Sequence, residues 1–219
     1  MSKNLLRKIR TFYSKSEIAL FKKLNTPGKI QDFLDTLKIN FEENGETVLS
    51  PRFVIRQKKA HCMEGAMLAA AILEFHGHKP LVLDLRAAKH DLDHVVAVFK
   101  VKGFWGSIGK TNHAVLRYRE PVYKTIRELA LSFFHEYFDT KGRKTLREYS
   151  NLLNLKHFNK LKWRTTEQDL FEIPEYLDTI KHFKILNAFQ IKNLRKADKI
   201  EIKAGELVEF RQTKKRRIP

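Results

Sequence analysis

The chain has 219 residues, of which 42% are hydrophobic and 11% aromatic, a composition that excludes a disordered chain and supports one large domain. Its formal net charge of +18 favours acidic partners, nucleic acid or an anionic surface, but only Arg211 and residues 214–217 form a basic cluster. A single cysteine excludes an internal disulfide and fits a reducing compartment, so we expect a cytoplasmic protein. No run reaches the ~20 apolar residues of a membrane helix, and we expect no signal peptide.

The first part of the chain is predicted to be helical. Residues 4–24 place apolar side chains at helical spacing, with Lys and Arg on the other face. This is typical of a helix packed on the protein, and a membrane-surface helix is the alternative. Thr26 and Pro27 supply the N-cap and first position of a second helix that runs to about Phe41. A short third helix is predicted over residues 52–57.

Cys62 stands directly before an Ala-rich run, residues 63–75, which predicts a buried helix packed closely on other elements. The N-terminus of a helix carries partial positive charge, which favours a thiolate over a thiol, and the thiolate is the nucleophile. The backbone N–H of Cys62 or of Met63 is the expected donor to an oxyanion, because helix N-termini present free N–H groups. Gln57 is the alternative donor.

Three strands are predicted after this helix, over residues 81–85, 94–99 and 104–108. A two-residue turn at Lys102-Gly103 pairs Val101 with Phe104 and makes the last two strands a hairpin. His94 opens the central strand, which should be covered on both faces. A helix packed on this sheet can place Cys62 beside His94, whose imidazole can take or return the thiol proton.

Four features follow one another here: Cys62 at the start of a small-residue helix, Gly77 at its end, His94 at the head of a strand, and Trp105 in the next strand. This order resembles the transglutaminase-like cysteine superfamily over about residues 27–120. The resemblance implies an α+β fold with a papain/transglutaminase-like core, in which a central helix packs on an antiparallel sheet. It also implies that Cys62 attacks an amide carbonyl and that His94 accepts the thiol proton.

The sequence departs from the family pattern at Gly109, which occupies the position that resembles the family's Asp. The hairpin register leaves Thr111, Asn112 or Ser107 to orient the imidazole. Asn112 is our prediction, because Asn has this role in papain-like enzymes. Asp91, on the loop before the central strand, is the better acidic candidate. The predicted catalytic set is therefore Cys62, His94 and Asn112.

The predicted domain organisation has three parts: residues 1–25 as an N-terminal helix, 26–138 as the transglutaminase-like core, and 139–219 as a C-terminal extension packed on the core, with a basic tail at 211–219. Both extensions are expected to be mainly helical. A helix is predicted over residues 126–137, a short helix over 145–154, a further helix after Thr166, and a terminal hairpin over 199–210.

Neither a metal nor a cofactor is predicted. The histidines and the cysteine between residues 61 and 113 match no standard zinc spacing. The sequence has no G-x-S-x-G motif, which disfavours a serine hydrolase, and no Walker A or dinucleotide glycine motif.

These observations predict a cysteine-dependent amide hydrolase or acyltransferase, of the peptidase, amidase or transglutaminase-like kind. Its partner is a peptide or amide substrate, for which the basic charge favours acidic character. The alternative is a catalytically degenerate fold that acts as a basic binding module for nucleic acid or an acidic partner. The sequence has no motif of a nucleic-acid-binding domain to support binding to nucleic acid. It also carries no signal for an oligomeric state.

Overall fold

The structure is a computed structural model that describes residue 7 and residues 9–211. The beginning of the first predicted helix and most of the predicted basic tail lie outside these residues. No helix in the described part of the chain combines the length and the apolar character that crossing a membrane requires.

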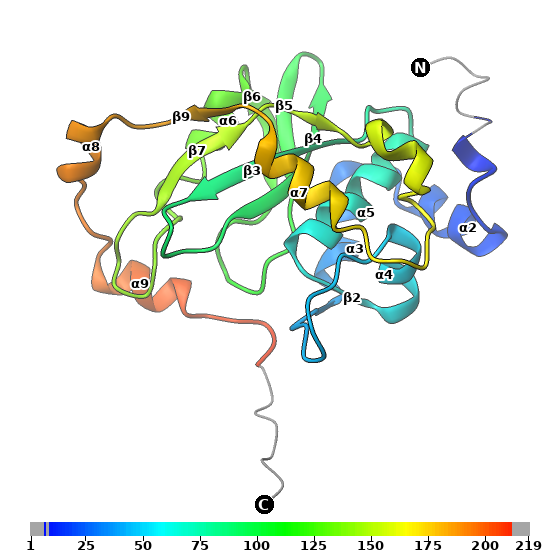
Figure 1. The fold of residues 1–219 in the computed structure, drawn as a ribbon, viewed down its shortest axis with the longest axis horizontal. Helices are drawn as coiled ribbons and strands as arrows, with labels where there is room; N and C mark the ends of the chain where they lie inside the picture. The colour runs from blue at the N-terminus through cyan, green and yellow to red at the C-terminus, as the bar shows by residue number, and fades with distance from the viewer. Residues whose placement is uncertain (1–6, 8, 212–219) are drawn as a thin grey trace, which may run out of the picture.

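An antiparallel sheet forms the centre of the molecule (Figure 1). Within the described residues it has seven strands in the order β6-β5-β4-β3-β7-β9, with β8 paired to β3 outside this path. The strands are β3 (Leu81–Ala87), β4 (His94–Val101), β5 (Phe104–Ile108), β6 (Arg119–Tyr123), β7 (Leu146–Ser150), β8 (Leu153–Asn154) and β9 (His182–Lys184). A separate short parallel pair joins β1 (Lys38–Ile39) to β2 (Lys59–Ala60).

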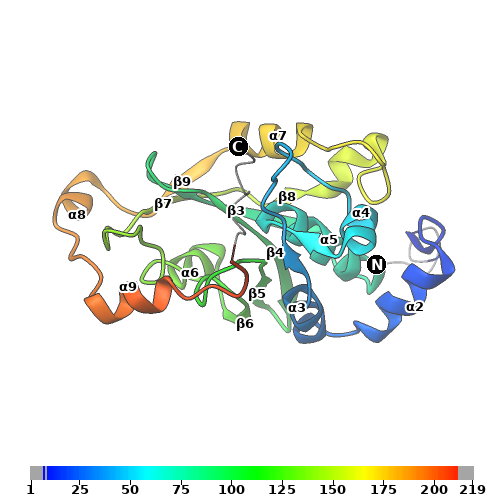
Figure 2. The same cartoon turned by 90° about the horizontal axis from the view of Figure 1, so that it is seen from below.

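The helices lie on both faces of this sheet. They are α2 (Lys15–Lys23), α3 (Pro27–Asp35), α4 (Pro51–Gln57), α5 (Cys62–Phe75), α6 (Ile126–Leu131), α7 (Glu172–Thr179), α8 (Ala188–Lys192) and α9 (Lys199–Gly205), with a 3₁₀ segment, η1 (Leu155–Leu161). Figure 2 shows α3, α4 and α5 on one side of strands β3 and β4, and α6 and α9 on the other. The α+β class is therefore confirmed, with α5 as the helix that packs on β4.

The hairpin of β4 and β5 has the predicted register, with Val101 opposite Phe104. Lys102 and Gly103 have φ angles of 47° and 92°. Positive φ at both central positions is the geometry of a two-residue turn whose twist matches the flanking strands, and glycine adopts it without steric cost. Strand β4 is buried on both faces, as its apolar run predicted, because alternate residues join two separate hydrophobic clusters.

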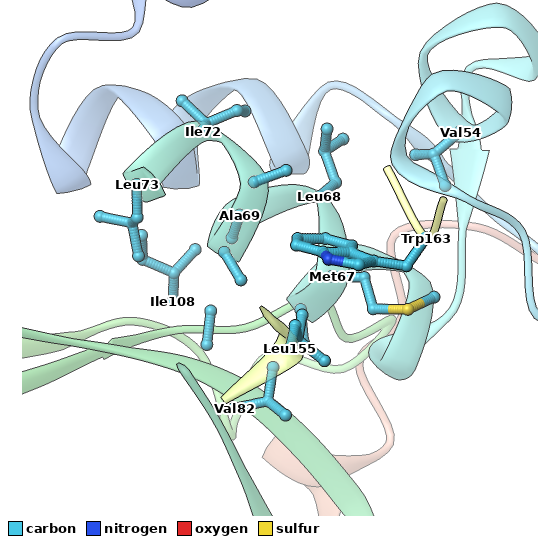
Figure 3. Packing of buried hydrophobic residues seen from close by; sticks show 14 of the residues in the cluster. Val54, Met67, Leu68, Ala69, Ile72, Leu73, Val82, Ile108, Leu155 and Trp163 are labelled. Atoms are coloured by element: carbon cyan, nitrogen blue, oxygen red, sulfur yellow. The ribbon is translucent and has the colours of Figure 1, made fainter. Parts of the chain in front are cut away.

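The larger of these clusters surrounds α5, as Figure 3 shows. The alanines of this helix are fully buried, so neighbouring elements approach its backbone closely. The indole of Trp163, from the segment after η1, lies beside Met67 and Leu68 of α5. The C-terminal part of the chain thus contributes a large side chain to the core around the helix that begins at Cys62.

The C-terminal extension differs from the prediction, because it is not mainly helical. Residues 145–154, predicted as a helix, contain β7, which pairs with β3 and with β9 and so continues the central sheet. The predicted terminal hairpin over residues 199–210 is also wrong, since α9 occupies its first half. Asp198 and Glu201 form a reciprocal capping box that stabilises the start of α9. The boundary placed at residue 138 therefore cuts through one continuous sheet.

The helix predicted over residues 4–24 is interrupted, since residues 7, 9 and 10 are helical but residues 11–14 are not. Helix α2 begins only at Lys15, because Ser14 caps it and exchanges hydrogen bonds with Glu17. The second helix begins at Pro27 with Thr26 as its N-cap, as predicted, but ends at Asp35 and is followed by β1.

Candidate functional site

Helix α5 begins at Cys62, and its thiol borders a pocket of about 480 Å³. Cys62 is a partly exposed residue and forms part of the wall of this pocket. The pocket wall comes from segments far apart in the sequence: His61 and Cys62, the loop 90–94, residues 110–116, residues 136–140, and the end of α9.

The start of α5 is fixed by the residue before the cysteine. His61 is the N-cap, and its Nδ1 accepts a hydrogen bond from the backbone N–H of Met63 at 3.3 Å. The carboxylate of Glu64 accepts from the backbone N–H of His61 at 3.0 Å, which completes a capping box. Glu64 is fully buried and also accepts hydrogen bonds from Asn40, Thr47 and the Leu49 N–H.

The imidazoles of His61 and His94 lie close enough to the Cys62 thiol to lower its pKa. Burial raises the pKa of this thiol, but hydrogen bonds to His61 and His94, together with their charge, lower the pKa by more, so that it lies well below the usual value. Burial lowers the pKa of His61, whereas its hydrogen bond to Cys62 and the nearby Glu64 raise it to about 9. The structure therefore brings Cys62 and His94 together, and it adds His61.

One of the two ring nitrogens of His94 has no hydrogen-bond partner among the described residues. This nitrogen is Nε2, and the residue is 6% exposed. A Cβ atom added to Gly109 would lie 3.3 Å from this Nε2. The side-chain amide of Gln31 fixes Gly109 in this position. It accepts a hydrogen bond from the Gly109 N–H at 3.1 Å and donates one to the Gly109 carbonyl at 2.9 Å. The position that resembles the family's Asp thus lies beside the imidazole but carries no carboxylate.

Asn112 does not orient the imidazole as predicted. Its side-chain amide donates to the carbonyl of Phe210 and accepts from the N–H of Phe210, both at 2.9 Å. Both ends of the amide are therefore occupied by the C-terminal segment, although Asn112 lines the same pocket. The carboxylate of Asp91 accepts instead from the Thr145 hydroxyl and the Leu92 N–H.

The other candidates for this orienting role are also placed elsewhere. The hydroxyl of Thr111 accepts from the N–H of His113. The hydroxyl of Ser107 is buried without a hydrogen-bond partner in the described part of the chain. No predicted residue thus takes the third position of a triad with His94.

In the described part of the chain, one backbone donor at the start of α5, the N–H of Cys62, is free to bind an oxyanion. The N–H of Cys62 makes no hydrogen bond to any atom of the described residues, whereas that of Met63 is bound to His61. Gln57 is exposed and does not line the pocket. The helix N–H groups are therefore closer to the thiol than the glutamine that we considered as the alternative.

Sequence reasoning missed His61 and the C-terminal wall of the pocket. A glutamate three residues after His61 has the spacing of a capping box, which could have marked position 61 as an N-cap beside the thiol. The wall forms because residues 205–210 pair with residues 112–114, for example through the Glu209 N–H and the Asn112 carbonyl at 3.0 Å. No local pattern indicates a contact between segments nearly a hundred residues apart.

A second group of ionisable side chains lies away from the pocket. Among the described residues, ligand atoms of three acidic, His or Cys side chains come within 4.8 Å of one another only at Asp84, Asp93 and Asp178. Arg86 and His182 contact Asp84, with the His182 Nε2 at 2.9 Å. The positive charge of Arg86 already balances part of the acidic group.

Asp84→Asn is expected to stabilise the protein at neutral pH. Burial raises the pKa of Asp84 to about 6, above the unfolded value of about 3.9. The folded state therefore binds more protons between these values, and stability falls as the pH rises from about 4 to about 6. Asparagine avoids this penalty. The free energy of unfolding of the variant, relative to that of the wild type, should therefore rise by about 2 kcal/mol as the pH rises from 4 to 7. Urea unfolding at both pH values measures this, and a pH-independent difference would contradict it.

Protein-family models and curated proteins were compared with this chain. No protein-family model matches it. No curated protein matches it either. The assignment of a function therefore depends on the geometry of Cys62, His61 and His94.

Proposed function

We propose that this chain is a cysteine-dependent amide hydrolase or acyltransferase of transglutaminase-like type. The observation that carries the proposal is that Cys62, a partly exposed residue at a helix N-terminus, lines one pocket together with His61 and His94, the two imidazoles that lower the pKa of its thiol. Hydrogen bonds from imidazoles and a helix dipole are the conditions that turn a cysteine into a thiolate nucleophile.

In the proposed reaction the Cys62 thiolate attacks an amide carbonyl, and an imidazole holds the thiol proton. The resemblance assigns this imidazole to His94. The carbonyl oxygen takes the negative charge near the N–H groups of α5, and the C–N bond then breaks as the proton passes to the leaving amine. Water attacks the resulting thioester in a hydrolase, whereas an amine attacks it in an acyltransferase. Because Cys62 must stay reduced, the proposal places the protein in the cytoplasm.

Alkylation by iodoacetamide at about pH 6 tests the nucleophile. Cys62 should react at least about tenfold faster than an ordinary thiol, which is almost wholly protonated at this pH. His94→Ala should slow the reaction, because one of the two hydrogen bonds to the sulfur is lost. Labelling at the rate of a free thiol would contradict the proposal.

Reaction with p-nitrophenyl acetate tests the acyl transfer itself. An enzyme should form one thioester on Cys62, seen as one added acetyl group in the intact mass, and should then turn over as water or added methylamine takes the acetyl group. Cys62→Ala is the matched control and should neither be acylated nor accelerate release of p-nitrophenol.

The second candidate is a degenerate site on a protein that acts as a basic binding module. The unpartnered Nε2 of His94 beside Gly109 favours it, because an imidazole without an orienting acceptor is a weaker general base. In that case p-nitrophenyl acetate would give no turnover. The wild type and Cys62→Ala would then bind an acidic polymer or nucleic acid equally well, with a strong dependence on salt.

A further inference from the structure

We infer that His61, not His94, holds the proton that Cys62 gives up, so that the site contains a His61 imidazolium paired with the Cys62 thiolate. The inference deepens the proposed function and depends on it for the catalytic meaning of the pair. It names a second catalytic imidazole, one residue before the nucleophile.

The outer nitrogen of His61 has acceptors in place. Its Nε2 lies 2.9 Å from the carbonyl oxygen of Thr47, 3.5 Å from a carboxylate oxygen of Glu64 and 3.8 Å from one of Glu42. An imidazolium donates from both nitrogens. Because Nε2 faces the Thr47 carbonyl, Nδ1 is the ring nitrogen left to take the thiol proton, and His61 can then donate from Nε2 to Thr47 while two carboxylates lie nearby.

The carboxylate of Glu64 is fixed in position by several hydrogen bonds. It is fully buried at the first turn of α5 and accepts from backbone N–H groups of His61 and Leu49 and from the side chains of Asn40 and Thr47. These donors fix the position of its carboxylate. Glu64 thus supplies to His61 the negative charge that Gly109 does not supply to His94.

The outer nitrogen of His94 has the opposite environment. Its Nε2 is buried and has no hydrogen-bond partner within residues 9–211. The nearest groups to a Cβ placed at Gly109 are a methyl group of Val96, this Nε2 and the carbonyl oxygen of Leu116, which lies 3.4 Å from that Cβ. A proton on this nitrogen would therefore be a buried donor without an acceptor, which disfavours the His94 imidazolium.

The proton transfer also changes the start of the helix. In the neutral ring, Nδ1 accepts from the Met63 N–H. When the thiol proton moves to Nδ1, this nitrogen becomes a donor to the sulfur and releases the Met63 N–H. Together with the unbonded N–H of Cys62, that group can stabilise the oxygen of the tetrahedral intermediate. As the C–N bond breaks, the proton passes from His61 to the leaving amine, and the thioester remains on Cys62.

The charged and titratable groups that face His61 are Cys62, Glu64 and Glu42. His94 faces the same thiol from β4. The rise in the pKa of His61 to about 9 agrees with this arrangement, since Cys62, Glu64 and the Thr47 carbonyl favour its charged form against the effect of burial.

Matched substitutions of the two imidazoles test the inference. Asn retains the N-cap at position 61, so His61→Asn should fold, and His94→Asn is the matched control. Titration of the thiolate absorbance should show a higher thiol pKa in both variants. His61→Asn should slow alkylation at about pH 6 by at least about tenfold, and His94→Asn by clearly less. An equal effect, or a larger effect of His94→Asn, would overturn the inference.

Nitrogen-15 NMR of the histidine rings tests it without altering the pair. At about pH 7 both ring nitrogens of His61 should carry a proton, and Cys62→Ser should remove one of them; a doubly protonated His94 beside a neutral His61 would overturn the inference.

Failure of the proposed function and failure of this inference give different results. A His61 imidazolium with no acylation by p-nitrophenyl acetate would reject the enzyme and keep the ion pair, whereas acylation that tolerates His61→Asn but not His94→Asn would keep the enzyme and reject the pair.

Discussion

Arg164→Leu is expected to destabilise the protein by about 3–5 kcal/mol, because it leaves a buried carboxylate without its charged partner. The guanidinium of Arg164 lies 2.6 Å from the Glu74 carboxylate through one nitrogen and 2.7 Å through another. Glu74 is fully buried near the end of α5, and Arg164 is 5% exposed. The ammonium group of Lys156 also lies near Glu74, but it is 3.8 Å from the other carboxylate oxygen. At this distance it cannot replace the hydrogen-bonded guanidinium. Urea unfolding followed by tryptophan fluorescence measures the loss.

Two further variants separate the ion pair from general damage to the core. Arg56 forms an exposed pair with Glu167 at 3.4 Å, so Arg56→Leu should change stability by less than about 1 kcal/mol. Arg164→Leu combined with Glu74→Leu removes both charges and should recover most of the loss. If the double variant were as unstable as Arg164→Leu alone, the packing of Arg164 over the Trp163 ring would be the larger contribution.

The parts of the fold that were predicted correctly depend on local chemistry. The hairpin of β4 and β5 follows from a Lys-Gly turn between two apolar runs, and α5 follows from a long run of helix-forming residues. Strand β7 was mistaken for a helix because its pairing with β3 joins residues about sixty positions apart. Such a pairing overrides the weak local preference of residues 146–150.

The candidate site shows the same division. The sequence order predicted a thiol beside His94, and the structure brings the two together, while their catalytic role stays a prediction. Asn112 was selected from the register of one hairpin, but a segment about a hundred residues later captures its amide. His61 was overlooked because an imidazole is an unusual N-cap, and its acceptors, the Thr47 carbonyl and the carboxylates of Glu42 and Glu64, are brought to it only by the fold.

Gly65→Ala is expected to lower the stability by about 3 kcal/mol, despite the better helix propensity of alanine. A Cβ at position 65 would lie 2.5 Å from the Cβ of Lys110, which is tied to the backbone and cannot swing away like the end of a long side chain. Helix α5 or the segment after β5 must therefore move. Lys110 follows Gly109, which lies beside His94, so alkylation of Cys62 at about pH 6 should slow as well. Urea unfolding and the alkylation rate measure the two effects.

Gly28→Ala is the matched control, because Gly28 lies in the first turn of α3 and a Cβ there meets nothing within 4 Å. It should leave the alkylation rate unchanged and raise the stability by up to about 1 kcal/mol, as expected for an unhindered helical glycine. The opposite signs of the two Gly→Ala substitutions would show that close contact with Lys110, and not glycine's flexibility, requires glycine at position 65. If Gly65→Ala were as stable as the wild type and labelled at the wild-type rate, α5 would not pack against Lys110 as closely as described, and the coupling of this packing to the site would be wrong.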